Sequence, residues 1–358
     1  MALLEARGVW REYDGREVLR DINLGVERGE VLVVMGPSGA GKTTLLRILS
    51  LIDRPTRGEV LFDGCDTWDL SLALRRRIAM VFQGGATFDA TVYKNVAYGL
   101  DVRGVREEEI KDRVAGALAL VGLSGYEGRR ARTLSWGEAQ RLGFAMATVF
   151  QPEVLLLDEP TANLDPINEG AIEEIIRRIK GLGITVVIAT HKQAEAYGLA
   201  DRIAVMNDGK VEQLGTRQEV FYRPRTPFVA AFMGVRNIFE GRVLKADPSG
   251  VRVTTRGMEV LAPPRDVREG EKIHLCIRPE EVLFLRQDRP LDPRLKNVFT
   301  GRVVGLAPRA TTVRVELQVG GDLLVADIPR HVAEKMAVAV GQEMRVSLKS
   351  EALHIIPG

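Results

Sequence analysis

Short apolar runs alternate with amphipathic stretches through the first half of the chain. The β-branched run 31–35 ends at a glycine and predicts a buried parallel strand. Residues 154–157 and 184–189 predict two further buried strands, whereas the periodicity of 43–52 and 169–181 predicts helices. Because strands and helices alternate, we expect an α/β doubly wound core.

Two parts of the chain depart from this alternation. Residues from about 86 to 147 have a mostly helical pattern, so we expect a helical subdomain inserted between two strands. The composition changes near 223–227, and short alternating strands separated by Gly, Pro and Asp follow Gly234. The pattern therefore predicts one domain at 1–234 and an all-β domain at 235–358.

The second domain contains an internal repeat. The segment 237–243 (NIFEGRV) returns 60 residues later at 297–303 (NVFTGRV), and a weaker match relates 270–273 to 341–344. Two matches in the same order favour a duplication over chance. We interpret the repeat as two small β-barrels of the oligonucleotide-binding-like (OB-like) type. The two units are expected at about 236–290 and 296–358.

Composition narrows the class of protein. The chain has 358 residues, of which 45% are hydrophobic and 27% charged, as in soluble proteins of two domains. The formal net charge of +2 gives no electrostatic reason to expect nucleic acid as a partner. The two cysteines, Cys65 and Cys276, indicate a reducing cytosol rather than a disulfide scaffold. We find neither a signal peptide nor an apolar run of about 18 residues, so any membrane role requires a partner.

The first predicted strand is followed by the pattern GxxxxGK[ST], directly before a predicted helix. Small residues let backbone N–H groups surround phosphates, and a helix N-terminus favours anions. We expect Lys42 to reach the β- and γ-phosphates of a nucleotide and Thr43 to place its hydroxyl on Mg²⁺. The predicted phosphate-binding residues are Gly36, Pro37, Ser38, Gly39, Ala40, Gly41, Lys42, Thr43 and Thr44.

The apolar strand at 154–157 ends in two adjacent carboxylates, Asp158 and Glu159. A helix N-cap explains one acidic residue at such a position more easily than two that precede Pro160. We expect Asp158 to hold Mg²⁺ through its water shell. Glu159 is expected to polarise the attacking water as a general base.

Around these motifs the sequence resembles the ATPases of ABC (ATP-binding cassette) transporters, over about residues 3–234. The segment 134–138 (LSWGE) resembles the family signature LSGGQ, and 162–165 (ANLD) resembles the D-loop. The resemblance identifies Gln83 as the glutamine that joins Mg²⁺ to the helical subdomain, and His191 as the switch histidine. It implies a P-loop NTPase fold that binds and hydrolyses ATP with Mg²⁺.

The same resemblance implies an aromatic platform for adenine before the P-loop. Tyr13 lies 29 residues before Lys42, at the family's position for this ring, and Trp10 is the alternative. A single tyrosine or histidine is usually structural. A functional role is favoured here only because these residues occur in the family's order around the phosphate motifs. The chain also departs from the family pattern: Trp136 replaces a signature glycine, Glu138 replaces the glutamine, and Lys192 follows His191 where many members have Asp.

The family mechanism implies the partners. Two copies of the chain are expected to sandwich two ATP molecules, each bound between one P-loop and the facing Ser135 and Gly137. Transmembrane permease subunits would receive the motion, and an extracytoplasmic solute-binding protein would act indirectly. The expected location is the cytoplasmic face of the cell membrane, as a peripheral protein.

The resemblance indicates an importer. The identity of the transported solute is its least specific implication. Segments 88–100 and 161–165 look most like tungstate and molybdate importers, and 297–303 with 346–350 resembles oxyanion-binding modules. Glu351 stands near Lys349 where it would repel an oxyanion. Importers of sulfate, polyamines or sugars share this layout and remain alternatives. A soluble ABC protein and a P-loop kinase are disfavoured, because the chain has one cassette and carries the signature and D-loop segments.

Overall fold

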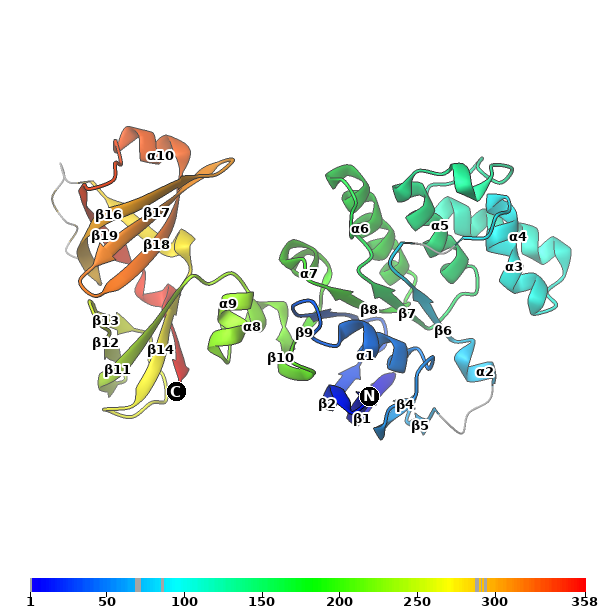
Figure 1. Ribbon diagram of the computed structural model, residues 1–358, viewed down its shortest axis with the longest axis horizontal. Coiled ribbons are helices and arrows are strands. Elements are labelled where there is room, and N and C mark those ends of the chain that lie inside the picture. The colour runs from blue at the N-terminus through cyan, green and yellow to red at the C-terminus, as the bar shows by residue number, and fades with distance from the viewer. Residues whose placement is uncertain (1, 68–71, 85–86, 287–289, 291, 293–294) are drawn as a thin grey trace. The chain divides into compact units, whose positions relative to one another are not determined.

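The computed structural model describes residues 2–67, 72–84, 87–286, 290, 292 and 295–358. The chain forms two compact units, Met1–Arg217 and Gln218–Gly358 (Figure 1). The sequence predicts a boundary later, at 234. The two short helices α8 (Arg217–Tyr222) and α9 (Pro227–Phe232) account for this difference, because they lie almost wholly in the second unit.

A six-stranded sheet forms the centre of the first unit, in the order β10-β9-β3-β8-β7-β6. Strands β9, β3, β8, β7 and β6 run parallel, and β10 pairs antiparallel with β9. Every residue of β3, β7 and β8 is buried, which explains their uninterrupted apolar sequences. The strands are β3 (Val31–Met35), β6 (Ile78–Val81), β7 (Val154–Asp158), β8 (Thr185–Thr190), β9 (Arg202–Asn207) and β10 (Lys210–Thr216).

The predicted helices beside this sheet are present with shifted ends. Helix α1 spans Lys42–Leu49 and stops short of 52, since Leu51 adopts a positive φ of 62°. Helix α6 (Pro166–Gly181) begins three residues earlier than predicted, because Asp165 caps its first turn and Pro166 suits the first helical position. Two shorter helices are α2 (Leu72–Arg75) and α7 (Gln193–Leu199).

The second sheet of this unit was not predicted from the sequence; it is antiparallel, with the order β2-β1-β4-β5. Its strands are β1 (Leu4–Tyr13), β2 (Arg16–Val26), β4 (Arg57–Phe62) and β5 (Cys65–Asp66). Helix α1 joins the two sheets in one core, where Leu45 and Leu49 cluster with Leu156 of β7 and Ile22 of β2. The P-loop helix is therefore fixed on two sides by buried apolar side chains.

Helices occupy the chain between β6 and β7, in the region where a helical subdomain is predicted. They are α3 (Val92–Val102), α4 (Glu107–Leu120), a 3₁₀ turn η1 (Ala131–Thr133) and α5 (Trp136–Thr148). The predicted start at 86 falls outside the described residues. Across the described part of the chain, no helix combines the length and apolar character needed to span a membrane.

The second unit contains two five-stranded antiparallel sheets, β13-β12-β11-β14-β20 and β15-β19-β16-β17-β18. Together they confirm the predicted all-β class and share one hydrophobic core. The first five strands are β11 (Asn237–Asp247), β12 (Gly250–Thr254), β13 (Glu259–Ala262), β14 (Lys272–Ile277) and β15 (Val282–Leu285). The others are β16 (Val298–Pro308), β17 (Thr312–Val319), β18 (Asp322–Pro329), β19 (Glu343–Leu348) and β20 (His354–Pro357). The shorter elements are η2 (Pro279–Glu281), α10 (Arg330–Lys335) and η3 (Ser350–Ala352).

The two sheets repeat each other and exchange one strand. Strands β11 and β14 pair in the first sheet as β16 and β19 do in the second, in agreement with the sequence repeat. However, β15 pairs with β19 and β20 pairs with β14, so each sheet takes its edge strand from the other half of the unit. The repeated asparagines act alike: Asn237 bonds the backbone of Val325, and Asn297 that of Leu261. Two contiguous barrels are thus too simple a description of this unit.

Candidate functional site

The loop between β3 and α1 contains the predicted phosphate-binding residues. Gly39 and Gly41 adopt positive φ angles of 82° and 99°, which L-residues with a side chain rarely take. A Cβ atom on Gly41 would lie 2.9 Å from the Val18 carbonyl oxygen, so this position also needs the missing side chain. The loop leads directly into the N-terminus of α1, where free N–H groups favour an anion.

Lys42 lies on the inner side of this loop and is 8% exposed. Its Nζ donates hydrogen bonds to the carbonyl oxygens of Gly36 (2.8 Å) and Pro37 (3.1 Å). Burial lowers the pKa of Lys42, and the nearby carboxylates of Glu159 and Asp158 act in the opposite direction. The ammonium group is 3.9 Å from a Glu159 carboxylate oxygen. The loop therefore presents one partly desolvated cation beside two acidic groups.

Oxygen ligands gather at the carboxyl edge of the six-stranded sheet. Asp158 ends β7, is 6% exposed and accepts a 3.1 Å hydrogen bond from the Thr43 hydroxyl. Burial is the main reason why the pKa of Asp158 is raised, and the Glu159 charge acts in the same direction. Val81 of β6 pairs with Leu157, so the exposed Gln83 follows its strand at the same edge. Carboxylate, hydroxyl and amide oxygens are the ligands that Mg²⁺ prefers, so these residues fit that ion.

Glu159 and His191 meet at the same edge, after β7 and β8. The His191 Nδ1 lies 3.0 Å and 2.9 Å from the two carboxylate oxygens of Glu159. Because a carboxylate can only accept, Nδ1 carries the proton in this bond. The Glu159 backbone has a φ of 47° and donates its N–H to the Ala189 oxygen at 2.9 Å. Backbone and imidazole together fix the direction of this carboxylate.

The signature residues begin helix α5. Ser135 is its N-cap and forms a capping box with Glu138: the Ser135 Oγ accepts from the Glu138 N–H at 3.3 Å, and the Ser135 N–H donates to the Glu138 carboxylate at 2.7 Å. The hydrogen bond from the Ser135 backbone is the main reason why the pKa of Glu138 is lowered. A glutamate at this position thus secures the helix start while staying ionised.

Two other signature residues have close neighbours from separate elements. A Cβ atom on Gly84, which follows Gln83, would lie 3.2 Å from the Trp136 ring, so this half-exposed ring packs beside the Gln83 segment. A Cβ atom on Gly137 would lie 2.4 Å from the Asn168 side chain of α6. The signature therefore contacts the turn after β6 on one side and the helix after the D-loop on the other.

Tyr13 lies at the end of β1. Its hydroxyl donates to Asp53 at 3.0 Å, and Asp53 also accepts hydrogen bonds from Arg47 of α1. The Arg11 guanidinium lies over the ring at 4.3 Å, and 39% of Tyr13 is exposed. The alternative ring, Trp10, lies 5.8 Å from the Arg57 guanidinium. Tyr13 is thus a held, accessible ring, as a stacking platform requires.

Two residues that connect the motifs were assigned no role from the sequence. Lys192 donates from Nζ to the Thr161 carbonyl oxygen at 2.8 Å and forms an ion pair with Glu169 of α6. Lys192 thereby links the segment after the switch histidine to the D-loop. An aspartate, which is common at this position in the family, cannot donate a hydrogen bond to that carbonyl oxygen. Asn168 is the other missed residue, and its place three residues after the N-cap Asp165 was the available signal.

Two protein-family models match parts of the chain. The family model described as ABC transporter matches residues 19–162, and the model described as TOBE domain matches residues 295–355. The first match includes the P-loop, the signature and both carboxylates. The second match lies in the unit whose two β-sheets exchange edge strands.

Proteins that are similar over most of the chain are ATP-binding proteins of import systems. The spermidine/putrescine import ATP-binding protein PotA of Nitrosospira multiformis is 40% identical over 85% of this chain and 84% of its own. The molybdate/tungstate import ATP-binding protein WtpC of Pyrococcus abyssi is 36% identical over 99% of this chain and 100% of its own.

Solved structures agree in fold. CbiO1 of Clostridium perfringens, part of the ABC transporter complex CbiONQ, has a TM-score of 0.58 at 36% identity, over 62% of this chain and 91% of its own. A dimeric, post-hydrolysis ATP-binding cassette with bound ADP and phosphate has a TM-score of 0.55 at 30% identity, over 60% and 98%. The chain therefore belongs to the family of ABC importer ATP-binding subunits, and it is an ATPase with a C-terminal TOBE domain.

Proposed function

We propose that this ATPase hydrolyses Mg-ATP at the carboxyl edge of the β7 and β8 strands. The observation that carries the proposal is the meeting of Lys42, Asp158, Glu159 and His191 at that edge. Lys42 and the P-loop N–H groups hold the phosphates, and Thr43, Gln83 and Asp158 hold Mg²⁺. When bound, that ion neutralises charge on the β- and γ-phosphate oxygens.

Glu159 acts as the general base in this proposal. Its carboxylate, oriented by the His191 Nδ1–H at 2.9 Å, accepts a proton from the water that attacks the γ-phosphorus. The P–O bond to the β-phosphate breaks, and ADP and phosphate leave. Lys42, 3.9 Å from Glu159, stabilises the charge that develops on the transferred group.

The active form in this proposal is a dimer of two copies. Ser135 and Gly137 start a helix whose N-terminus can accept the γ-phosphate bound to the facing P-loop. The capping box fixes the direction of that helix start before the dimer closes. ATP then stabilises the closed state, because only that state lets both copies contact it.

We predict that Tyr13→Ala weakens ATP binding and leaves the chemical step unchanged. Loss of a base stacked on an aromatic ring costs about 1–3 kcal/mol. Calorimetry with ATP and single-turnover hydrolysis measure the two effects separately. Trp10→Ala is the matched control, and a loss of affinity in that variant alone would assign adenine to Trp10 instead.

We predict that Trp136→Gly raises ATP turnover at unchanged monomer affinity for ATP. The ring packs beside Gly84 and is half exposed at the start of α5, where a glycine would allow closer approach to the facing phosphate. Phosphate release with the permease present is the measurement. Trp136→Phe keeps an aromatic contact and should stay near the wild-type rate. Unchanged turnover of the glycine variant would leave Trp136 a packing residue.

For the transported solute, we propose an oxyanion of the molybdate or tungstate class. Relatives with that printed solute are 35–36% identical over 99% of this chain, whereas the spermidine/putrescine relatives that align over 98–99% of it are 33–34% identical. The chain would act on two permease subunits at the cytoplasmic face of the membrane. A solute-binding protein would deliver the solute to these subunits from the other side. We infer each of these partners from membership of the importer family and not from contacts within this chain.

A polyamine is the second candidate solute. The relatives named for spermidine and putrescine reach 40% identity over 85% of the chain, and others of that name align over 98–99% of it. Reconstitution of the chain with its permease and solute-binding protein distinguishes the two candidate solutes. Tungstate and molybdate should stimulate ATP turnover, and spermidine should not. Stimulation by spermidine alone would reverse the assignment.

A further inference from the structure

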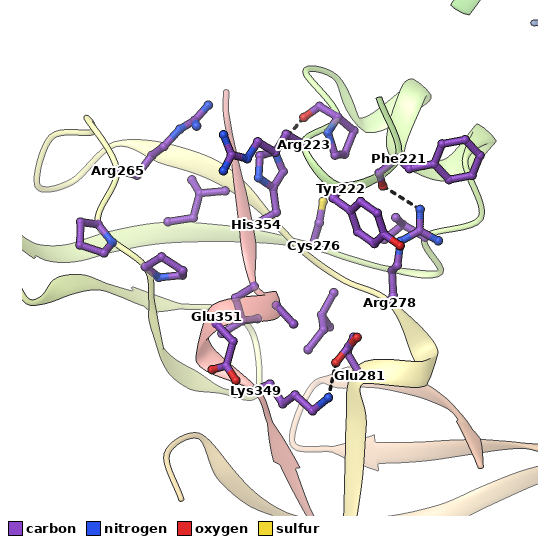
Figure 2. Close-up of a pocket in the computed structure, with 18 residues that line it drawn as sticks. Phe221, Tyr222, Arg223, Arg265, Cys276, Arg278, Glu281, Lys349, Glu351 and His354 are labelled. Atoms are coloured by element: carbon purple, nitrogen blue, oxygen red, sulfur yellow. Dashed lines mark hydrogen bonds and ion pairs between the residues drawn. The ribbon is translucent and has the colours of Figure 1, made fainter. Parts of the chain in front are cut away.

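A pocket of about 740 Å³ in the second unit is lined by several charged groups (Figure 2). Lys349 donates to Glu281 at 2.6 Å, and Arg278 donates to the Phe221 carbonyl oxygen at 2.7 Å. These bonds give the three charged groups a structural role within that unit. A buried carboxyl group of the first unit, in contrast, has no ion pair among the residues that the structure describes, and it lies beside the residues proposed for ATP hydrolysis.

This carboxyl group is the side chain of Glu195, on α7. Glu195 is 2% exposed, and both carboxyl oxygens are buried without a well-directed hydrogen bond from the described part of the chain. Burial of an ionised carboxylate is costly, so such a group keeps its proton to a higher pH. Burial is accordingly the main reason why the pKa of Glu195 is raised, and the Glu159 charge adds to it. Glu195 is therefore an acid that can donate a hydrogen bond as well as accept one.

The other groups that act on Glu195 lie on the segments packed around α7. The hydroxyls of Thr161 and Thr190 and the charge of Lys192 act to lower its pKa, against the effect of burial. Lys192 is engaged elsewhere, because its Nζ donates to the Thr161 carbonyl oxygen at 2.8 Å and pairs with Glu169 of α6. Strand β3, which also packs against α7, consists of apolar residues. The two hydroxyls are thus the groups suited to exchange hydrogen bonds with the carboxyl.

Both threonines belong to segments that carry the proposed catalytic groups. Thr161 is buried and follows Glu159 by two residues. Thr190 is buried at the end of β8 and directly precedes His191. The Thr190 Oγ1 already accepts from the Lys192 N–H at 3.1 Å, so its own proton is available to another acceptor. A carboxylic acid, with one donor and an acceptor, suits two hydroxyls on separate segments.

We propose that Glu195 is a positioning residue for ATP hydrolysis, whose carboxylic acid group joins the hydroxyls of Thr161 and Thr190. This junction holds the segment after β7 against the segment after β8, and so keeps the Glu159 carboxylate 2.9 Å from the His191 Nδ1. The inference rests on the proposed role of Glu159 as the general base. Glu195 acts through these residues and takes no part in the transfer of a proton or of phosphate.

Two variants of similar size separate the hydrogen bonds from the packing. Glu195→Gln keeps a donor and an acceptor and should stay within about twofold of wild-type turnover, whereas Glu195→Met keeps only the volume and should be about tenfold slower or more. ATP affinity in calorimetry should match the wild type in both. Glu174→Met, the same change on an exposed carboxylate of α6, should keep wild-type turnover. Normal turnover of Glu195→Met, or an equal loss in Glu195→Gln, would overturn the proposal.

Thr161→Val tests the same junction from its other end. If Glu195 acts through the Thr161 hydroxyl, the double variant with Glu195→Met should lose no more turnover than the slower single variant. Losses that multiply in the double variant would show two independent effects and overturn the proposal.

The pH dependence of unfolding tests the protonated state of Glu195. An acid whose pKa is raised on folding contributes stability that is complete below its unfolded value and is lost as pH rises through its folded value, whereas glutamine does not titrate. The melting temperature of Glu195→Gln should therefore rise relative to the wild type between about pH 5 and about pH 8. A constant difference over this range would contradict a protonated Glu195.

Glu159→Gln, assayed in parallel, separates this inference from the proposed mechanism. If Glu159→Gln loses its turnover and Glu195→Met does not, only the role of Glu195 is overturned. If Glu159→Gln keeps near-normal turnover, the proposed general base is wrong. The double variant and the pH-dependent unfolding then still decide whether Glu195 joins the two segments.

Discussion

Glu159→Gln should hydrolyse ATP at least a hundredfold more slowly than the wild-type chain while binding Mg-ATP with similar affinity. The amide keeps the size of the side chain but cannot accept the proton of the attacking water, and general bases contribute about 10²–10⁴ in rate. The contact with the His191 Nδ1–H survives through the amide oxygen, so the fold at this edge should persist. Single-turnover phosphate release measures the hydrolysis rate, and calorimetry with ATP measures the affinity.

The control for this variant is another carboxylate of the same unit. Glu174→Gln changes an exposed residue of α6 that pairs with Arg178, and its turnover should be that of the wild type. If Glu159→Gln retained near-normal turnover, Glu159 would not be the base. A loss of ATP affinity in Glu159→Gln would instead indicate a role in binding.

Lys42→Ala should fail at the earlier step of nucleotide binding. The substitution removes the cation that the P-loop holds beside Asp158 and Glu159, and with it a charge-assisted contact to the phosphates. A hydrogen bond to a charged group is worth about 1.5–3 kcal/mol, so ATP affinity should fall about tenfold to a hundredfold. Titration calorimetry with ATP measures this loss directly.

An exposed lysine provides the comparison. Lys111→Ala removes a cation from α4 that pairs only at the surface with Glu107, and its ATP affinity should not change. Thermal unfolding of both variants shows whether they remain folded. Unchanged ATP affinity in folded Lys42→Ala would remove the P-loop assignment.

Local patterns were enough to predict the centre of the first unit. Strands β3, β7 and β8 are buried on both faces, so their sequences are continuous apolar runs. The P-loop motif needs fixed residue types at fixed spacing, and the carboxylate pair directly follows its own apolar strand. In each of these motifs the residues that carry the prediction lie within a few positions of one another, although the fold then brings Thr43 and Asp158 together.

The features that the sequence did not reveal depend on contacts distant in the chain. Strand β1 pairs with β4 about 50 residues away, and its alternating pattern is broken by register shifts. The exchange of β15 and β20 leaves the repeat itself unchanged, so the repeat predicts two contiguous units. The bridge from Lys192 to Thr161 joins residues 31 positions apart, and only the fold brings them together.

The most direct test of the proposed mechanism is the mass of Glu159→Gln in solution, measured by light scattering with and without Mg-ATP. The chain has a mass of 39.5 kDa, and the proposal predicts that Mg-ATP doubles it, because the slow variant accumulates the closed dimer. The double variant that also carries Lys42→Ala should remain a monomer. A mass that stays at 39.5 kDa while Glu159→Gln has ATP bound would contradict a site shared between two copies.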